Sequence, residues 1–509
     1  MKKKRRLKKS VKVVFKLIIC IVMLLLSMLC FKYIYDMDIL PDKYLYILIG
    51  VILFINFISG ILLFVKGIIS KIFSVILYLI LGIISIIGIK YAKNTIDYFN
   101  DGFSNSIVEY STYNVIVAND SLYSNINELN DSVMGYLFLD VDNDKYLDVI
   151  SDTVNVELKE TDIYGIYEGL LDGDVNSIVI NEAYIGFIEE QYSEFSVNTR
   201  ILYSFNVEKE TDTNVSKIEE LKPVNIYLSG SDSRSGVINT STLSDVNMII
   251  TINPNTHQIL LTNIPRDFYV QLHGTTGLKD KLTHAGIYGI DMSRKTLEDL
   301  FGIEIDYSVK VGFNSVIKLV DLVGGIDVYS DKAFRSHCGD GGAERVRVVV
   351  GMNHFNGAQA LSYARERYAY KDGDRHRGRN QQQVIEAVVS KIMNDKSILL
   401  KYDTLLSSLS DIYRTDIPKE FVTLFIKDQL ENMSSWEFIT QAVDGSGASR
   451  KTYSMPSLNL YVMIPNMDTV NAAIEKINIV SGLISSEVDL SDIVNILFGD
   501  SYNNLTISS

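Results

Sequence analysis

The first hundred residues constrain the fold most, because they contain three apolar stretches in close succession. These stretches cover residues 17–35, 44–65 and 72–89, and each approaches the ~20 residues that an α-helix needs to cross ~30 Å of hydrocarbon. A cleaved signal peptide would account for one of them but not for three. We therefore predict a basic N-terminus and three transmembrane helices within residues 1–95.

The charges around these stretches predict the orientation of the chain in the membrane. Residues 1–16 carry nine Lys and Arg and no acid, which favours the cytoplasm, whereas the first loop, residues 36–43, is acidic. Lys90 and Lys93, just after the third stretch, favour the opposite orientation but are outnumbered. Three crossings from a cytoplasmic N-terminus predict a multi-pass protein of the cell membrane with a large extracellular C-terminal part.

Composition and net charge limit the kinds of molecule that the protein is expected to bind. The net charge is −14 although the N-terminus is strongly basic, so the part beyond the membrane is acidic. A nucleic-acid partner is not expected, because binding its phosphates needs a positive face. The three cysteines, Cys20, Cys30 and Cys338, are too scattered for a disulfide framework.

Beyond the membrane the sequence predicts an α/β fold in several units. In residues 110–215, apolar strands such as Tyr113–Val117 alternate with helical segments, in an order similar to one lobe of a periplasmic solute-binding protein. We predict that this region is an accessory lobe. A polar stretch, Glu208–Lys222, separates it from a larger α/β region in residues 223–395. Residues 396–509 are predicted to be an extension whose helices and strands pack on that region.

Within residues 224–383, charged residues cluster at the ends of predicted strands or at the starts of predicted helices. They are Asp232, Arg234, Asp245, Arg266, Asp267, Lys281, Arg365, Arg367, Arg375, Arg377, Arg379 and the adjacent Gln381. Each alone has an ordinary explanation, since a surface Arg usually pairs with a nearby acid and an Asp after a strand usually forms a turn. Arginines crowded into residues 365–379 are different, because they repel one another unless a polyanion or several carboxylates compensate them.

A pyrophosphate group would compensate this charge, because guanidinium groups match phosphate oxygens with paired hydrogen bonds. Asp232 and Asp245 would hold Mg²⁺ (or Mn²⁺) beside it, since such hard ions prefer oxygen ligands. Aspartates and arginines together suit phosphoryl transfer, whose catalysis rests on positioning and charge neutralisation. The patterns G-x-x-x-x-G-K-[ST], G-x-S-x-G and H-E-x-x-H, which indicate other kinds of catalytic site, do not occur. An alternative is a nucleophile pair of His337 and Cys338.

The motifs from residue 230 to residue 381 resemble, in order and spacing, the LytR-CpsA-Psr family, and in detail its CpsA-type, capsule-associated branch. They are Gly230-Ser-Asp232-Ser-Arg234, Ser244-Asp245-Val-Asn, Asn263-Ile-Pro-Arg266-Asp267, Lys281-Leu-Thr-His284-Ala285, Val323-Gly-Gly-Ile-Asp-Val328, Gly357-Ala-Gln-Ala-Leu361, Ala364-Arg365-Glu366-Arg367 and Gly373-Asp374-Arg375 through Gln381. Each motif alone is weak, but the ordered set is specific. The sequence departs from the pattern at Leu243, where many members have an arginine.

The resemblance implies an α-β-α sandwich with a hydrophobic tunnel for a polyprenyl chain and a site for its pyrophosphate head group with Mg²⁺. It makes Asp232 and Asp245 the carboxylates on the metal side. The residues that would clamp the phosphates are Arg266, Arg365, Arg367 and Arg377, and those that would assist substrate binding are Arg234, Lys281, Arg375 and Gln381. Asp267 or Glu366 would either deprotonate the acceptor hydroxyl or orient neighbouring arginines, and we favour the orienting role.

The implied function is a membrane-anchored, Mg²⁺-dependent phosphotransferase. It would attach a phosphate-linked glycopolymer, such as a capsule polysaccharide or a teichoic acid, from a polyprenyl-pyrophosphate carrier to peptidoglycan. Its partners would be the lipid-linked glycan, the peptidoglycan acceptor, the membrane and other proteins of capsule or wall synthesis. Two alternatives stay open: a non-catalytic sensor or regulator that holds the lipid pyrophosphate, and a hydrolase that uses water as the acceptor.

Overall fold

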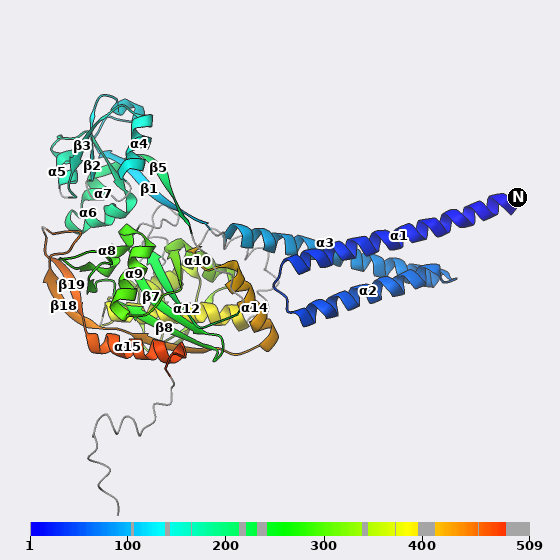
Figure 1. Cartoon of the computed structure of the whole chain (residues 1–509). Helices are drawn as coiled ribbons and strands as arrows, with labels where there is room; N and C mark the ends of the chain where they lie inside the picture. Colours follow the sequence, from blue (N-terminus) through cyan, green and yellow to red (C-terminus); the bar gives the residue numbers. More distant parts are fainter. Residues whose placement is uncertain are drawn as a thin grey trace, which may run out of the picture.

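The structure is a computed structural model of the chain, and it describes residues 2–102, 106–137, 143–163, 165–212, 220–231, 242–337, 345–371, 373–394, 413–456 and 458–484. These residues form three parts: a bundle of long helices, a small α/β lobe and a larger α/β core (Figure 1). The bundle projects away from the other two parts, and the small lobe lies on the core.

Three long helices form the N-terminal bundle: α1 (Lys2–Asp36), α2 (Asp42–Phe64) and α3 (Ile68–Gly102). All three are long and apolar enough to cross a membrane, which confirms the number of spanning helices predicted. Many of their large apolar side chains are exposed, as expected of helices that face lipid. Helix α3 continues past residue 95, the predicted end of this part, and leads toward the small lobe.

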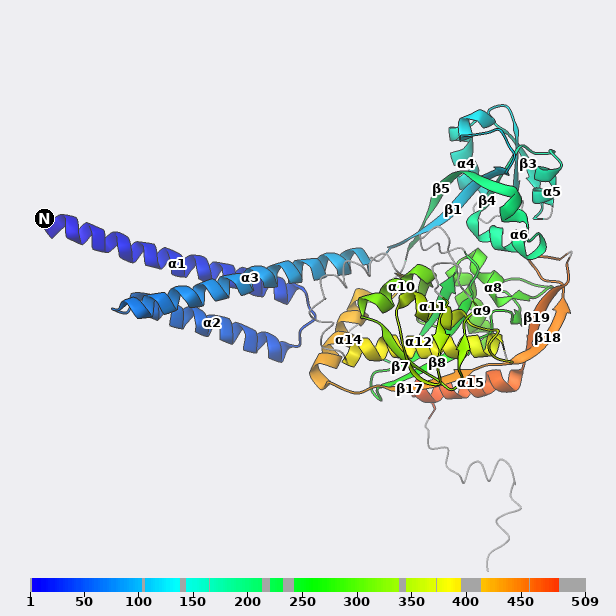
Figure 2. The same ribbon diagram turned by 180° about the vertical axis from the view of Figure 1, so that it is seen from behind.

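The core contacts the helical bundle at the loop between α1 and α2, at the start of α2 and at the end of α3. Lys427 of α14 (Lys419–Asn432) lies 2.6 Å from Asp38 in that loop, measured from Nζ to Oδ1. The hydroxyl of Tyr98, near the end of α3, forms a hydrogen bond with that of Tyr413. The first loop and the end of α3 therefore lie on the side of the core, as three successive crossings require (Figure 2).

The small lobe is built on a five-stranded sheet in the order β3-β2-β4-β1-β5. Its central strand β4 is buried throughout, because helices cover both faces of the sheet. On one face α4 packs around Tyr113 and Tyr146, whose rings stack 4.3 Å apart, and α5, α6 and α7 cover the other face. The elements are β1 (Ser106–Ala118), η1 (Ile126–Leu129), β2 (Val133–Leu137), α4 (Asn143–Thr153), β3 (Glu157–Thr161), α5 (Gly165–Leu171), β4 (Ser177–Asn181), η2 (Glu182–Tyr184), α6 (Ile185–Gln191), α7 (Phe195–Asn198) and β5 (Thr199–Asp212).

The core is built on a six-stranded sheet in the order β16-β11-β6-β7-β8-β17. Strands β6, β7 and β8 pair antiparallel, whereas β11 runs parallel to β6 and β17 parallel to β8. The strands are β6 (Val224–Ser231), β7 (Val246–Asn253), β8 (Gln258–Ile264), β11 (Tyr307–Gly312), β16 (Tyr413–Thr415) and β17 (Glu437–Ala442).

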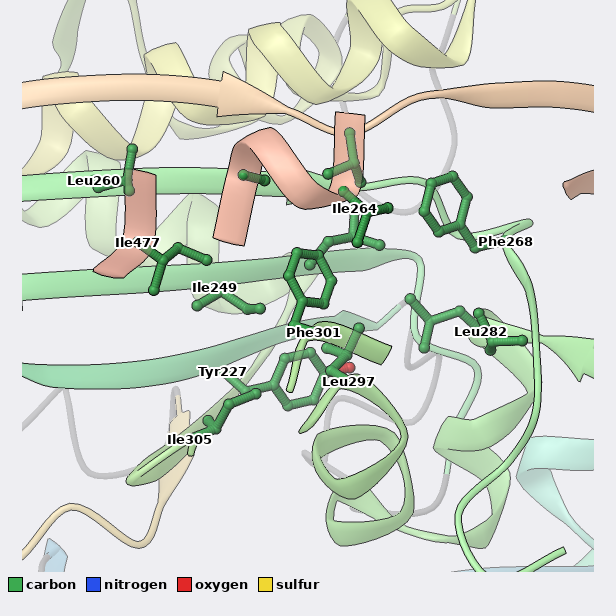
Figure 3. Close-up of a cluster of buried hydrophobic side chains, with 14 of the residues drawn as sticks. Tyr227, Ile249, Leu260, Ile264, Phe268, Leu282, Leu297, Phe301, Ile305 and Ile477 are labelled. Carbon is green, nitrogen blue, oxygen red and sulfur yellow. The ribbon is translucent and has the colours of Figure 1, made fainter. Parts of the chain in front are cut away.

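Helices cover both faces of this sheet, because successive side chains of a strand point to opposite faces and both sets are apolar. On one face Tyr227, Ile249 and Leu260 pack against α9 and α15 (Figure 3). On the other face their neighbours Leu228 and Met248 pack toward α12. This is the predicted α-β-α sandwich. Its helices are α9 (Ile290–Phe301), α10 (Phe313–Leu322), α11 (Gly357–Arg365), α12 (Asp374–Asn394), α14 and α15 (Met467–Val480).

Short elements surround the sandwich. The two-stranded sheets of the described residues pair β9 with β10, β12 with β15, β13 with β14 and β18 with β19. Helix α8 and the turn η3 lead into α9. Their bounds are β9 (Tyr269–Val270), β10 (Asp280–Lys281), α8 (Leu282–Ala285), η3 (Gly286–Tyr288), β12 (Ile326–Ser330), β13 (Phe334–Arg335), β14 (Arg347–Val348), β15 (Gly351–Phe355), β18 (Gly445–Arg450) and β19 (Leu460–Pro465).

Two boundaries differ from those that the sequence predicts. Residues 396–509 are more than a covering extension, because β16 and β17 come from this segment and form the two edges of the core sheet. The apolar residues of the segment Gln381–Met393 predict a helix over that range, but the structure begins this helix, α12, seven residues earlier at Asp374. The arginines of residues 375–379 therefore lie on the first turns of a helix and not in a loop.

Candidate active site at one edge of the core sheet

Several of the predicted site residues adjoin strand ends that the sheet brings to one edge. The end of β6 lies beside the start of β7 and the end of β11, and the start of β7 lies beside the end of β8. Ala442, at the end of β17, pairs with Asn263 near the end of β8. The loops that leave these strands therefore meet at the carboxyl ends of the parallel strands, where α/β sheets bind ligands.

Asp245 and Arg266 meet at this edge. The carboxylate of Asp245 accepts a hydrogen bond from Nη1 of Arg266, and each side chain is 20% exposed. The backbone N–H of Asp245 donates to the carbonyl of Gly230 at 2.8 Å, which fixes Asp245 to the end of β6. The structure thus brings together two residues from separate motifs, in a position that a ligand can reach.

Asp267 lies behind Arg266 and is 8% exposed. Its Oδ1 is 3.9 Å from Arg266 Nε and 3.7 Å from Lys281 Nζ. A carboxylate placed between two cations reduces their repulsion and restricts both side chains. This geometry supports the orienting role that we favour for Asp267.

Arg365 lies at the end of α11 beside the edge of the sheet, and Arg367 follows it two residues later. The guanidinium of Arg365 lies over the ring of Phe313, 4.5 Å from its centroid, and Phe313 directly follows β11. Arg367 is exposed, and its guanidinium lies over the ring of Tyr368 and donates to the Tyr368 hydroxyl at 2.8 Å. The sequence reasoning missed Phe313, although its position directly after a strand that ends at this edge is the signal that indicates it.

Glu366, between these arginines, is fully buried and holds the loop that follows α11. Its carboxylate accepts hydrogen bonds from the backbone N–H groups of His337, Tyr368 and Ala369 at 2.6, 2.7 and 2.9 Å. Burial opposes ionisation, but these N–H groups outweigh it, and the pKa of Glu366 lies below its ordinary value. The contacts favour a role in shaping the loop over a role as a base.

The first turns of α12 bring further positive charge to the edge. The arginines of residues 375–379 lie there, where the positive end of the helix dipole makes cations unfavourable. Gly378 fits tightly against Asn263, since a Cβ at Gly378 would lie 2.1 Å from Asn263 Nδ2. Asn263 lies three residues before Arg266, so the helix begins close to Arg266. An anion bound here would offset both the crowded cations and the helix end.

Two predicted substrate-binding residues of α12 differ in their contacts. The Nε of Arg375 lies 2.7 Å from Asp444 Oδ1, and its Nη2 donates to the carbonyl of Gly445 at 3.0 Å. These contacts tie α12 to the turn after β17. Gln381 is partly buried on the second turn, next to Gln382, whose amide donates to the backbone of β8 and β17.

Some predicted residues cannot be placed in this site. Asp232, Arg234 and Cys338 lie outside the described residues. His337, the predicted partner of Cys338, lies 3.2 Å from Glu366, measured from Nδ1 to Oε1. The lipid tunnel that the resemblance implies stays a prediction.

Asp245 fits one half of the predicted metal site. Its carboxylate is partly exposed beside Arg266, and Mg²⁺ is commonly held by one or two carboxylates together with water and phosphate oxygens. Among the residues that the structure describes, no group of three or more His, Cys, Asp or Glu side chains is placed to hold a metal ion. In this part of the chain, an ion at Asp245 would depend on the substrate's phosphates for further ligands.

Leu243 connects the small lobe to the site. Its Cδ1 lies 2.8 Å from where a Cβ would stand on Gly186 of α6, so the glycine permits a close approach. Phe187, the next residue of α6, packs against the ring of His284 in a tilted arrangement, with 4.3 Å between the centroids. Leu243, at the position that often holds an arginine in the resembled family, therefore packs the small lobe against the core, two residues from Asp245.

Comparisons with known proteins agree with the motifs. The LytR_cpsA_psr family matches residues 195–464. TagU of Bacillus cereus, named polyisoprenyl-teichoic acid–peptidoglycan teichoic acid transferase, is 32% identical over 234 residues, which are 46% of this chain and 73% of TagU. The protein of the same name from Enterococcus faecalis is 30% identical over 241 residues, 47% of this chain and 76% of that protein. The crystal structure of B. subtilis TagV is 27% identical and covers 51% of this chain and 98% of its own, with a TM-score of 0.42.

Proposed function

Because the chain belongs to the LytR-CpsA-Psr family, we propose that it is a membrane-anchored phosphotransferase that moves a phosphate-linked glycopolymer from a polyprenyl-pyrophosphate carrier to peptidoglycan. The observation that carries the proposal is the meeting of Asp245 and Arg266 beside the arginine-rich start of α12. The two TagU relatives are named as transferases of teichoic acid to peptidoglycan. The resemblance to the capsule-associated branch favours a capsule polysaccharide as the polymer.

In the proposed reaction, a hydroxyl oxygen of the acceptor attacks the phosphorus that is bonded to the glycan. A new P–O bond forms, the P–O bond to the carrier's other phosphate breaks, and polyprenyl monophosphate leaves with the electron pair. The hydroxyl proton passes to solvent or to a nearby carboxylate. The positive side chains that would hold the pyrophosphate and neutralise its developing charge are Arg266, Arg365, Arg367 and Arg377. Asp267, which also pairs with Lys281, would keep Arg266 in place.

Asp245 would hold Mg²⁺, with Asp232 as the second carboxylate predicted by the motif. When bound, the ion would supply further neutralisation of the phosphate oxygens. Asp245 also restrains the Arg266 guanidinium, so one carboxylate would position both positive groups against the same phosphate. Manganese would suit the same oxygen donors.

We propose that the site lies outside the cell. The basic N-terminus favours the cytoplasm, and the acidic first loop is on the side of the core, where Asp38 meets Lys427. The bundle would then hold the site close to the outer leaflet. A lipid-linked substrate in that leaflet gains effective concentration from such an anchor.

The test uses the full chain in lipid nanodiscs with a synthetic polyprenyl-pyrophosphate glycan, Mg²⁺ and peptidoglycan. We expect release of polyprenyl monophosphate and, in equal amount, glycan bound to peptidoglycan through phosphate. Release of the lipid without attached glycan would identify a hydrolase. Tight binding of the donor without any release would identify a sensor, and either result contradicts the proposal.

A further inference from the structure

We propose that helix α6 of the small lobe is a positioning element of the site, and that its residues Gly186 and Phe187 hold the two chain segments that carry Asp245 and Arg266. This inference rests on the proposed function and deepens it, because it makes transfer depend on how the lobe is seated on the core. The lobe would serve the chemical step by placing groups that belong to the core.

Two adjacent residues of α6 contact two separate segments of the core (Figure 1). A Cβ on Gly186 would stand 2.8 Å from Cδ1 of Leu243, so the missing side chain lets the helix come this close. The ring of Phe187, which is 1% exposed, packs against that of His284 on α8. Leu243 precedes Asp245 by two residues. One turn of α6 therefore bears on the segment before Asp245 and on α8 together.

Thr283, the neighbour of His284 on α8, joins these two segments to each other and to the site. Its backbone N–H donates to the carbonyl of Arg266 at 2.8 Å, and its carbonyl accepts from the backbone N–H of Ser244 at 3.1 Å. Ser244 directly precedes Asp245. The backbone of one residue thus sets the spacing between the chain that carries the carboxylate and the chain that carries the guanidinium.

Helix α8 is anchored in the core, so it moves as a unit with its surroundings. Asp280 and His284 are fully buried, and Oδ1 of Asp280 lies 2.6 Å from Nδ1 of His284. The carboxylate of Asp280 also accepts a hydrogen bond from the backbone N–H of Ser454 at 2.8 Å. Just after α8, a Cβ on Gly286 would overlap the carbonyl oxygen of Thr242. Close-packed interiors transmit strain, so a shift of α6 would pass to α8 and would not be absorbed between them.

The pair of Asp245 and Arg266 is sensitive to such a shift. Their side chains are joined by a hydrogen bond, so the direction of the guanidinium depends on the spacing of the two backbones. A misplacement of ~1 Å caused by a distant change can cost ~10²-fold in rate. Misplaced groups stabilise the transition state less, while the other arginines still bind the donor. The lobe should therefore act on kcat more than on KM.

The first experiment adds bulk at Gly186 and removes it from Leu243, using the full chain in nanodiscs and the release of polyprenyl monophosphate. Gly186→Val should lower kcat about tenfold or more with the donor KM within about twofold of wild type, because the added methyl groups push the two segments apart. Leu243→Ala alone should lower kcat about threefold at most, and the double variant should return to within about threefold of wild type. The matched control is Gly169→Val on α5, where a Cβ would contact Asp174 and Val175 of the lobe, and it should keep the kcat of wild type.

A second pair of variants tests the other contact and decides the matter if Gly186→Val does not fold. Phe187→Leu removes the ring that packs against His284 and should lower kcat about threefold or more at an unchanged KM. The matched control is Phe195→Leu, which alters an equally buried ring of the same hydrophobic cluster that packs against Tyr167 of the lobe. It should lower the melting temperature as much as Phe187→Leu does and leave kcat within about twofold of wild type.

Hydrogen exchange, read by mass spectrometry, needs no turnover and so separates this inference from the proposed function. In Gly186→Val and Phe187→Leu, the peptides that contain Ser244 and Thr283 should exchange about tenfold faster or more, because their backbone hydrogen bonds open more often. The two control variants should exchange there as wild type does. A wild type that transfers no glycan would contradict the proposed function, and the exchange rates would still show whether α6 holds the two segments.

Three results would overturn the positioning role in a chain whose wild type is active. The first is a wild-type kcat in both Gly186→Val and Phe187→Leu. The second is a loss that Leu243→Ala does not restore, or that the control variants share, because the effect would then not pass through these contacts. The third is an increase confined to the donor KM, which would make α6 a binding surface for substrate.

Discussion

The charged site consists of two clusters of side chains, and the clusters differ in what surrounds their positive charges. The strand-end cluster consists of Asp245, Arg266, Asp267 and Lys281, and its side chains are linked by ion pairs and at most one-fifth exposed. The helix cluster consists of five arginines. Arg365 and Arg367 lie over aromatic rings at the end of α11, and Arg375, Arg377 and Arg379 lie on the first turns of α12. The strand-end cluster is oriented by its own carboxylates. The helix cluster concentrates positive charge that a bound polyanion would stabilise.

The largest effect is expected in the strand-end cluster, from Arg266→Ala. Removing one preorganised positive group from a phosphoryl-transfer site should lower kcat by ~10²–10³-fold. Release of polyprenyl monophosphate under saturating donor measures it. Arg266→Lys is the control: it keeps the charge but not the planar fork, so its activity should lie between those of Ala and wild type. Wild-type activity in the Ala variant would mean that the strand-end cluster does not hold the phosphate.

A smaller effect is expected in the helix cluster, from Arg367→Ala. Its guanidinium is exposed and contacts Tyr368, so folding should not depend on it. One charge-assisted hydrogen bond to a phosphate is worth ~1.5–3 kcal/mol, so kcat/KM should fall by ~10–100-fold with an unchanged melting temperature. A loss of stability that accounts for the lost activity would place Arg367 in the scaffold, and the contrast between the two clusters would then fail.

The buried Glu366 should affect stability and its dependence on pH. Glu366→Gln replaces an acceptor of three backbone N–H bonds and should lower the free energy of unfolding by ~1.5–3 kcal/mol at neutral pH, measured by urea denaturation. Because the folded-state pKa is depressed, this contribution is present above the ordinary value of 4.5 and is lost as the pH falls through the folded-state pKa. Wild type and variant should therefore converge in acid. A gap that stays constant down to about pH 3 would show that ionised Glu366 is not the cause.

The strand-end cluster could be predicted well from the sequence. Asp245 and Arg266 adjoin apolar strands, and antiparallel pairing of β7 with β8 brings the start of one strand to the end of the next. Local patterns are enough to place such residues at one edge of a sheet. The same reasoning predicts Asp232 and Arg234 at this edge, and because both lie outside the described residues this stays a prediction.

The helix cluster and the lobe contact were less accessible to sequence reasoning. Basic residues on the first turns of a helix oppose its dipole, so the local rule argued against the true start of α12 at Asp374. The contact of Leu243 with Gly186 joins the core to the small lobe, and neither residue has a local pattern that indicates the other. Tertiary packing determines both the start of α12 and the contact of Leu243 with Gly186. For the contact, the departure from the family pattern at Leu243 was the signal available in the sequence.

The smallest effect is expected at Arg375 and Asp444, where the helix cluster contacts the turn after β17. Their side chains are 47% and 39% exposed, so a double-mutant cycle with Arg375→Gln and Asp444→Asn should give a coupling of only ~0.2–1 kcal/mol in urea denaturation. Arg375→Gln should also leave kcat/KM within about twofold of wild type, since its Nε and Nη2 already bind Asp444 and Gly445. A loss of tenfold or more would show that Arg375 leaves Asp444 for the phosphate, as its motif predicted. All the arginines of the helix cluster would then bind the substrate, and none would serve only to stabilise the fold.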